Sequence, residues 1–116
     1  MEREQPVFVR IVTMIEDDIL RGTYGEDDLI ISTPQIAKLL KVNPTTAQRA
    51  IGVLTDRGII YKQRGIGMAV TPEARGLILQ ERRKDFYEHG IAAFIDEAEK
   101  IGISVKDLLK IIKEKT

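Results

Sequence analysis

The chain has 116 residues, of which 43% are hydrophobic and 31% are charged, and its formal net charge is zero. This length suits one main core with a small extension rather than two large independent domains. No apolar run approaches the length of a bilayer-crossing helix, and the first residues, MEREQP, lack the basic-then-apolar pattern of a secretion signal. We therefore expect a cytoplasmic protein with no membrane partner.

The composition also restricts the chemistry that the chain can carry. It contains no cysteine, which excludes disulfides and thiolate metal sites, and its one histidine, His89, cannot supply an imidazole cluster. No nucleophile and base recur in an interpretable arrangement, so the sequence predicts no enzyme, no cofactor and no metal centre. A metal site made of carboxylates alone stays open.

The charges are distributed unevenly along the chain. Residues 1–31 carry three basic and eight acidic side chains, a net charge of −5, whereas residues 32–70 carry six basic side chains against Asp56 alone, a net charge of +5. The remainder has nine of each sign. A positive block in the middle of the chain favours a polyanionic partner, with an uneven distribution by chance as the alternative.

The first predicted element is an amphipathic helix that begins after Pro6 and ends before Gly22. Its apolar residues follow a helical period, and the glycines at positions 22 and 25 stop it. Acidic residues 16–18 lie on its polar side, and residues 26–28 form a second acidic group in the loop that follows. We interpret both groups as solvated surface rather than as a metal cluster.

Two further helix starts, Thr33-Pro34 and Asn43-Pro44, lie ten residues apart. Each pairs a capping side chain with a proline, and the sequence between them, IAKLLK, is long enough for about two helical turns and a tight turn. This spacing predicts a helix-turn-helix. The buried stripe of its second helix comprises Ala47, Ala50, Ile51 and Leu54, which leaves Thr45, Thr46, Gln48, Arg49 and Gly52 outside.

The outer face of this second helix is suited to nucleic acid. Its hydroxyls, amide and guanidinium can donate to phosphates and read base edges, and the helix N-terminus adds backbone amides that favour anions. Glutamine suits the adenine edge and arginine the guanine edge, so Gln48 and Arg49 are the candidates for direct readout. The alternative is an ordinary capped helical hairpin with a solvated face.

The segment from Ile59 to Val70 predicts a two-stranded hairpin. IIYKQ and MAV have strand-compatible side chains, and the glycine-containing RGIG between them favours a turn. A hairpin in this position is a wing, in which Lys62 and Arg64 could meet phosphates or enter a minor groove. The alternative is a surface hairpin that only covers the core. Residues 65–67 lack the third glycine and the strand-to-helix setting of a dinucleotide fingerprint.

From Glu73 to about Lys100 the chain is predicted to form one long charged helix, in which Gly90 marks a bend or close packing. Gly102 ends it, and Ser104 caps a last short helix. We therefore divide the chain into a winged helix-turn-helix domain, residues 1–71, and a helical tail, residues 72–116. Two such helices cannot bury their apolar faces alone, so we expect them to pair with a second chain rather than only to fold back.

Three segments, QPVFVRIVTMIEDDIL, VNPTTAQRAI and GIIYKQRGIGMAV, together resemble the N-terminal winged-helix domain of GntR-family bacterial transcription regulators. The charged two-helix tail is similar in size and order to that of the YtrA-type subgroup. The resemblance covers residues 5–71 strongly and the tail weakly. It implies a fold that is mostly α with a small β-hairpin, in which a winged helix-turn-helix domain is followed by a short two-helix C-terminal dimerisation extension. The resemblance further implies a homodimer, formed through that C-terminal region, that binds palindromic operators. It also implies, for this subgroup, control of transporter operons.

The resemblance assigns site residues by position. Ile30, Ile31 and Ser32 correspond to a family leucine-proline-serine segment, and Pro34 stands where the family commonly has an arginine used against DNA, which leaves more of the recognition to Gln48, Arg49 and the wing. The candidate DNA-binding residues are Ser32, Thr33, Lys38, Asn43, Thr45, Thr46, Gln48, Arg49, Lys62, Arg64, Gly65 and Gly67. The candidate dimerisation residues are Leu77, Ile78, Phe86, Ile91, Phe94, Ile95, Leu108, Leu109 and Ile112.

The leading hypothesis is therefore a DNA-binding repressor that acts as a homodimer on an inverted-repeat operator. The zero net charge and the proline at position 34 motivate the alternative, a winged helix that serves as a protein-interaction module without specific DNA binding. A small ligand pocket around Phe86, Tyr87 and Phe94, or one between subunits, is a weaker alternative to simple packing.

Overall fold

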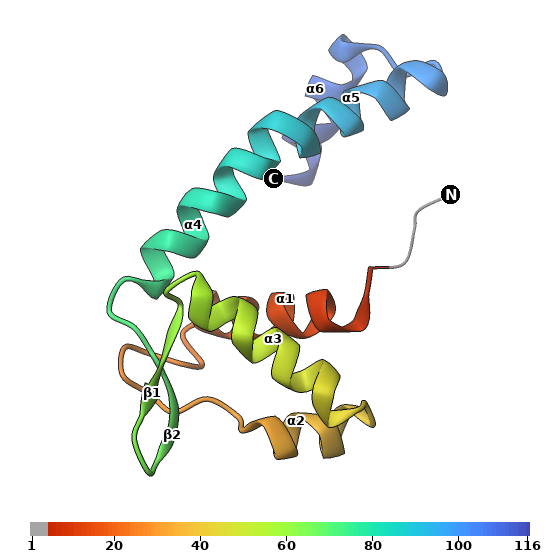
Figure 1. Ribbon diagram of the computed structural model, residues 1–116. Helices are drawn as coiled ribbons and strands as arrows, with labels where there is room; N and C mark the ends of the chain where they lie inside the picture. The colour runs from red at the N-terminus through yellow and green to blue at the C-terminus, as the bar shows by residue number, and fades with distance from the viewer. Residues whose placement is uncertain (1–4) are drawn as a thin grey trace. The chain divides into compact units, whose positions relative to one another are not determined.

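The computed structural model describes residues 5–116 and is mostly helical with one β-hairpin, as the sequence predicts (Figure 1). The first four residues of the MEREQP segment lie outside the described residues. The chain forms two compact units, one up to Leu79 and one from Gln80 onward.

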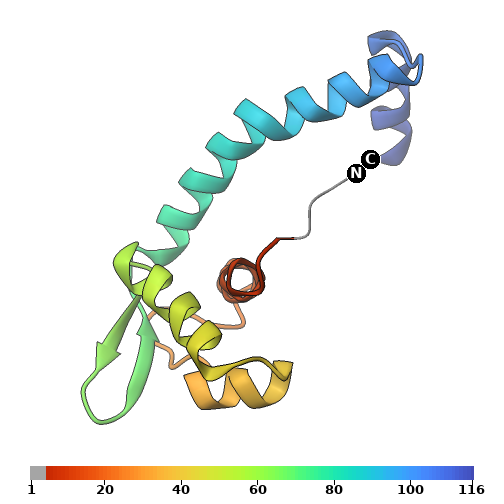
Figure 2. The ribbon, with the colours of Figure 1, turned by 45° about the vertical axis from the view of Figure 1, so that its right-hand side comes forward.

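The first unit begins with three helices: α1 (Val7–Arg21), α2 (Thr33–Leu40) and α3 (Pro44–Asp56). Helix α1 ends as predicted, because Gly22 adopts a left-handed conformation with a φ of 85° and donates its N–H to the last turn. In Figure 2 α1 is seen end-on beside α3, with α2 below both. The three helices enclose the core that positions the outer face of α3.

The cap of α2 differs from the sequence prediction by one residue. Ser32, rather than Thr33, is the N-cap: its Oγ accepts from the Gln35 N–H at 3.2 Å, and the Gln35 Oε1 accepts from the Ser32 N–H at 2.9 Å. This reciprocal capping box satisfies two backbone donors. Thr33 could not form one, because Ile36, three residues further along, has no side-chain acceptor. Thr33 is instead the first residue of the helix.

The predicted hairpin consists of β1 (Ile60–Gln63) and β2 (Gly67–Val70), paired antiparallel from Ile60 opposite Val70 to Gln63 opposite Gly67. The loop before α2 lies along the other side of β2, because the Ile30 N–H donates to the Met68 carbonyl at 2.9 Å. The hairpin is therefore held to the helical core along β2, and its turn extends beyond that support.

The core of the first unit is aliphatic and draws on every element of that unit. The Glu16 side chain, expected on a solvated face, is also buried, and its Oε2 accepts from Arg57 Nη2 at 2.7 Å. This ion pair joins α1 to the residue that follows α3. The largest fully buried side chains are Ile11, Ile15, Ile36, Leu54, Ile59, Ile60, Val70 and Ile78.

The predicted long helix begins in the first unit and continues into the second. It comprises α4 (Ala74–Asp85), a five-residue π-helical segment (Phe86–Gly90) and α5 (Ile91–Lys100). The units divide inside α4, later than the predicted boundary after Thr71, because Ala74 and Ile78 pack in the core of the first unit.

The last helix, α6 (Val105–Lys115), begins where the sequence predicts. Gly102 has a φ of 76° and Ser104 caps α6 by accepting from the Asp107 N–H at 3.1 Å. No helix within residues 5–116 is both long enough and apolar enough to cross a membrane. In the same range, no three His, Asp or Glu side chains are grouped so that they could hold a metal ion.

Candidate nucleic-acid interface

The outer face of α3 is presented by a helix whose start and buried side are both well defined. Asn43 Oδ1 accepts from the Thr45 N–H at 2.8 Å, which caps the helix as predicted. Ala47 and Ala50 are fully buried, so Thr45 and Gln48 project on the exposed side, while Thr46 is half-buried. The first turns of α3 therefore offer one hydroxyl and one amide to a ligand, next to the positive end of the helix.

The Arg49 side chain is engaged within the protein. Its guanidinium carbon lies 3.9 Å from the centroid of the Phe8 ring on α1, the geometry of a cation–π contact. Phe8 itself packs against the core. Arg49 is still exposed, but this contact directs it toward α1, whereas the sequence analysis assigned it to direct base readout.

The start of α2 contributes a second group of polar side chains. Ser32 and Lys38 are exposed, Thr33 is half-buried, and Pro34 is exposed in the first turn. The Ser32 hydroxyl accepts from the backbone in the capping box and so keeps its own hydrogen available for an anion.

The hairpin presents two exposed cations, Lys62 on β1 and Arg64 in the turn. The turn closes where the Ile66 N–H donates to the Gln63 carbonyl at 2.9 Å. Gly65 occupies its third position with a φ of 78°, the value that a type II turn requires and that favours glycine.

Two side-chain hydrogen bonds brace one face of the hairpin. The Tyr61 hydroxyl donates to Asp27 Oδ1 at 2.9 Å, and Gln63 Nε2 donates to the same hydroxyl at 3.0 Å. Asp27, expected to be solvated, is thus a structural contact for β1. This brace limits how far the turn with its cations can swing.

These groups lie at one end of the first unit. Figures 1 and 2 agree that α2, the N-terminal end of α3 and the hairpin turn lie toward the same end. Of the six cations in the central block, Arg57 is paired with Glu16, whereas Lys38, Lys41, Arg49, Lys62 and Arg64 are exposed. The result is a cationic surface around a helix start, which suits a phosphate backbone on either side of a groove.

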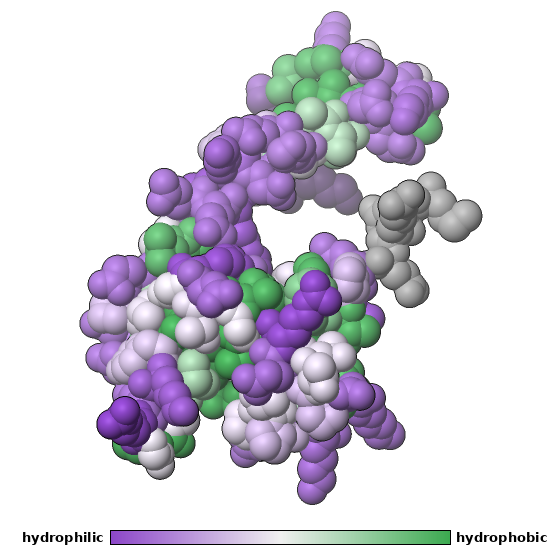
Figure 3. All heavy atoms as spheres, in the orientation of Figure 1, coloured by the Kyte–Doolittle hydropathy of each residue, from purple (hydrophilic) through white to green (hydrophobic). Residues whose placement is uncertain are grey.

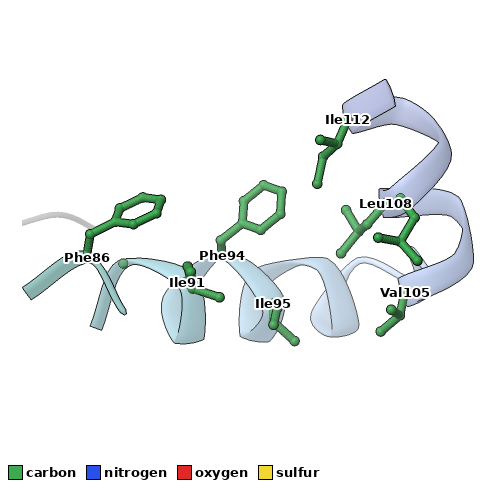
Figure 4. A pocket seen from close by; sticks show the side chains of 9 residues that line it. Phe86, Ile91, Phe94, Ile95, Val105, Leu108 and Ile112 are labelled. Atoms are coloured by element: carbon green, nitrogen blue, oxygen red, sulfur yellow. The ribbon is translucent and has the colours of Figure 1, made fainter. Parts of the chain in front are cut away.

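The second unit carries an apolar groove with a cavity volume of about 570 Å³. Phe86 and Phe94 project from the same side of the helical run, and Leu108 and Ile112 of α6 point toward Phe94 (Figure 4). Gly90 makes room for the Phe86 ring, since a Cβ there would lie 3.0 Å from Phe86 Cδ1. The groove is lined by Phe86, Gly90, Ile91, Phe94, Ile95, Val105, Leu108, Leu109 and Ile112.

Seven of the nine candidate dimerisation residues therefore line this groove, and two do not. Ile78 is 0% exposed in the core of the first unit, and Leu77 packs against that core. Ile78 consequently has no surface to offer a second chain. His89 is exposed, and its Nδ1 lies 3.1 Å from Asp85 Oδ1 on the preceding turn.

Sequence reasoning missed the contacts that hold the interface in place. Phe8 belongs to the apolar stripe of α1, and no local signal distinguishes it as the partner of Arg49. Tyr61 and Asp27 are likewise separated by 34 residues, so nothing in their neighbourhoods predicts the hydrogen bond between them.

The three helices with a hairpin after the second motif helix define a winged helix-turn-helix protein. No protein-family model matches the sequence. The fold is similar to that of a GntR-family transcriptional regulator from Listeria monocytogenes, with 32% sequence identity over 98% of both chains and a TM-score of 0.74. The chain is also 25% identical to the HTH-type transcriptional repressor YtrA of Bacillus subtilis strain 168, over 94% of this chain and 83% of the relative.

A third similar protein is the DNA-binding domain of AraR in complex with operator ORR3. The match covers 61% of this chain and 86% of the AraR chain, with 25% sequence identity and a TM-score of 0.58.

The similarity to the Listeria protein extends over nearly the whole of both chains at 32% sequence identity. The chain therefore belongs to the GntR family of transcription regulators. The match to YtrA extends through the tail and confirms the predicted YtrA-type subgroup. Members of this family are regulators rather than enzymes, which confirms the prediction that the chain is not an enzyme.

Proposed function

We propose that the protein is a sequence-specific repressor that binds an inverted-repeat operator as a homodimer in the cytoplasm. The observation that carries this proposal is the exposed start of α3, with Thr45 and Gln48 free of the core and cations of α2 and the hairpin at the same end of the unit. The operator complex of the similar AraR domain supports DNA as the ligand.

Gln48 is the main base-reading residue in this proposal. Its amide can form two hydrogen bonds with an adenine in the major groove, and the Thr45 methyl or hydroxyl can meet the neighbouring base. Asn43 caps the start of α3, and the half-buried Thr46 is the adjoining candidate for a DNA contact. Arg49 is engaged with Phe8, so we assign it a smaller share of base recognition than Gln48.

The remaining candidates position the protein on the DNA backbone. Ser32, Thr33 and Lys38 at α2, and Lys62 and Arg64 on the hairpin, would contact phosphates on either side of the groove. Gly65 and Gly67 lack side chains, which allows the turn to approach the DNA closely.

The tail groove supports the homodimer. Apolar side chains on α5 and α6 remain exposed in the single chain, among them Phe94, Ile95, Leu109 and Ile112, and Figure 3 shows hydrophobic surface over these helices. Covering them with the same face of a second chain gives a two-fold assembly, and two-fold symmetry predicts an inverted repeat in the DNA.

Repression is supported by the relative YtrA, which is an HTH-type transcriptional repressor. The assignment to a transporter operon rests on the subgroup resemblance alone, and mapping of bound chromosomal sites would test it.

Selection of bound fragments from a random DNA pool tests the central proposal. We expect enrichment of an inverted repeat. Gln48→Ala should lose about 1–3 kcal/mol of binding free energy and relax specificity at one position in each half-site. The matched hairpin variant Lys62→Ala should weaken binding to all sequences alike and lower the salt slope by about one.

Failure of the wild-type protein to enrich any motif would overturn the proposal. Binding to a partner protein that is insensitive to Gln48→Ala and Lys62→Ala would point instead to an interaction module.

A further inference from the structure

The turn of the hairpin carries an exposed aliphatic side chain, Ile66, which has 67% of its surface accessible. The other large apolar residues of the hairpin behave differently, since Ile60 and Val70 are buried and Met68 packs against the core. Ile66 therefore contributes no packing that would explain an isoleucine at this position of the first unit.

The backbone holds Ile66 in a defined place. Its N–H closes the turn by donating to the Gln63 carbonyl, and the glycines on both sides have φ values of 78° and 156°. A Cβ at Gly65 would meet nothing within 4 Å, so its positive φ, rather than lack of space, is what favours glycine there. With a glycine on each side, Ile66 has no side chain at either adjacent position of the turn.

The neighbouring charge indicates what Ile66 meets. Arg64 is exposed in the same turn, and Lys62 is exposed on β1. In Figure 3 the end of the hairpin, at lower left, shows strongly hydrophilic surface next to a smaller hydrophobic one. A narrow cationic element with an aliphatic tip suits the minor groove, which is about 6 Å wide, carries negative potential, and accepts apolar side chains as wedges.

An aliphatic tip would recognise the groove by shape. It cannot hydrogen-bond to bases, and the 2-amino group of guanine is the one donor that protrudes into the minor groove. An isoleucine packed against the floor of the groove would clash with that protruding group, whereas an A·T pair has no group protruding there.

We propose that Ile66 is a specificity-determining residue that enters the minor groove beside each half-site and selects A·T over G·C pairs there. The inference rests on the proposed DNA-binding function and extends it to base pairs outside the reach of α3. Arg64 supplies the attraction to the groove in this arrangement, and Ile66 supplies the discrimination.

The test uses the full-length protein and the operator obtained by selection, with the flanking pairs of each half-site set to A·T, G·C or inosine·C. Inosine lacks the 2-amino group but resembles guanine in the major groove. The wild-type protein should bind the A·T and inosine·C flanks alike and the G·C flank about tenfold more weakly, as expected for a difference near 1.4 kcal/mol.

Two variants and one control complete the experiment. Ile66→Ser should reduce the difference between flanks to less than about threefold, whereas the isomeric Ile66→Leu should retain it. Leu39→Ser, at a side chain of α2 that is also 67% exposed, should leave the discrimination between flanks unchanged.

Equal wild-type affinity for A·T and G·C flanks would overturn the inference, as would discrimination that persists in Ile66→Ser. Weak binding to inosine·C comparable to that for G·C would also overturn it, because the readout would then lie in the major groove. In each of these cases the enriched operator itself would still support DNA binding, whereas the absence of any enriched operator would overturn the proposed function.

Discussion

At the scale of single residues, Arg49 shows how a neighbouring helix changes the role that a sequence pattern suggests. Its position on the polar side of α3 is correctly predicted, and arginine is the usual partner of guanine. In the folded chain its guanidinium lies over the Phe8 ring, so using it for base readout would require that contact to be given up.

A double-mutant cycle measures this contact. We expect Phe8→Leu and Arg49→Met to show a coupling free energy of about 0.5–1 kcal/mol in urea unfolding, the size of an exposed cation–π pair. Arg49→Met should also weaken operator binding less than Gln48→Ala does. Negligible coupling free energy, together with a loss of base specificity in Arg49→Met, would instead show that Arg49 reads a base directly.

The structure also alters the interpretation of a second residue, Arg57, in the positive block of residues 32–70. One of its six cations, Arg57, binds Glu16, which is 7% exposed and belongs to the acidic N-terminal segment. A net charge counted along the sequence therefore overstates what the interface offers by one cation. The other five basic side chains of the block remain exposed.

At the scale of elements, the start of α2 depends on which residue caps it. Ser32 forms the capping box with Gln35, and Thr33 begins the helix. The same serine is a candidate phosphate contact, so the cap also fixes the orientation of a binding group.

Two single variants distinguish the contribution of Ser32 to the stability of the helix start from that of Thr33. Ser32→Ala should lower the free energy of unfolding by about 1 kcal/mol, because it leaves the Gln35 N–H without its acceptor. The matched control Thr33→Ala should change it by less than about 0.5 kcal/mol. Chemical denaturation followed by circular dichroism measures both. A larger loss for Thr33→Ala than for Ser32→Ala would contradict the capping geometry.

At the scale of the whole molecule, we expect the tail groove to connect dimer assembly to DNA binding. The single chain leaves Phe94 and its apolar neighbours exposed, and an inverted-repeat operator requires two chains. Loss of assembly through the tail would therefore weaken binding to the complete operator more than binding to one half-site.

Adding a charge to the groove tests this link. Phe94→Asp should convert the dimer to a monomer in analytical ultracentrifugation and weaken binding to the complete operator by more than about tenfold, with half-site binding retained. Lys106→Asp places the same residue on α6 outside the groove lining and should remain dimeric. A Phe94→Asp protein that stays dimeric would show that the chains pair elsewhere.

Much of the fold could be predicted because its signals are local. Gly22 and Gly102 end helices through their own backbone conformations, and Asn43 and Ser104 cap helices by accepting from residues two or three positions away. The candidate site was predicted less completely. The sequence placed Gln48 and Arg64 on exposed surface, but it gave no sign that Ile78 would be buried in the first unit.

The sequence by itself determined the order of the elements, the start of α3 and the family resemblance, because caps, glycines and apolar periods act within a few residues of one another. Only the tertiary structure decided which polar side chains are already engaged. Arg57 and Glu16 lie 41 residues apart in the chain, and they meet, like Arg49 and Phe8, only because α3 packs against α1. Such pairs depend on how helices pack in three dimensions, which no short stretch of sequence specifies.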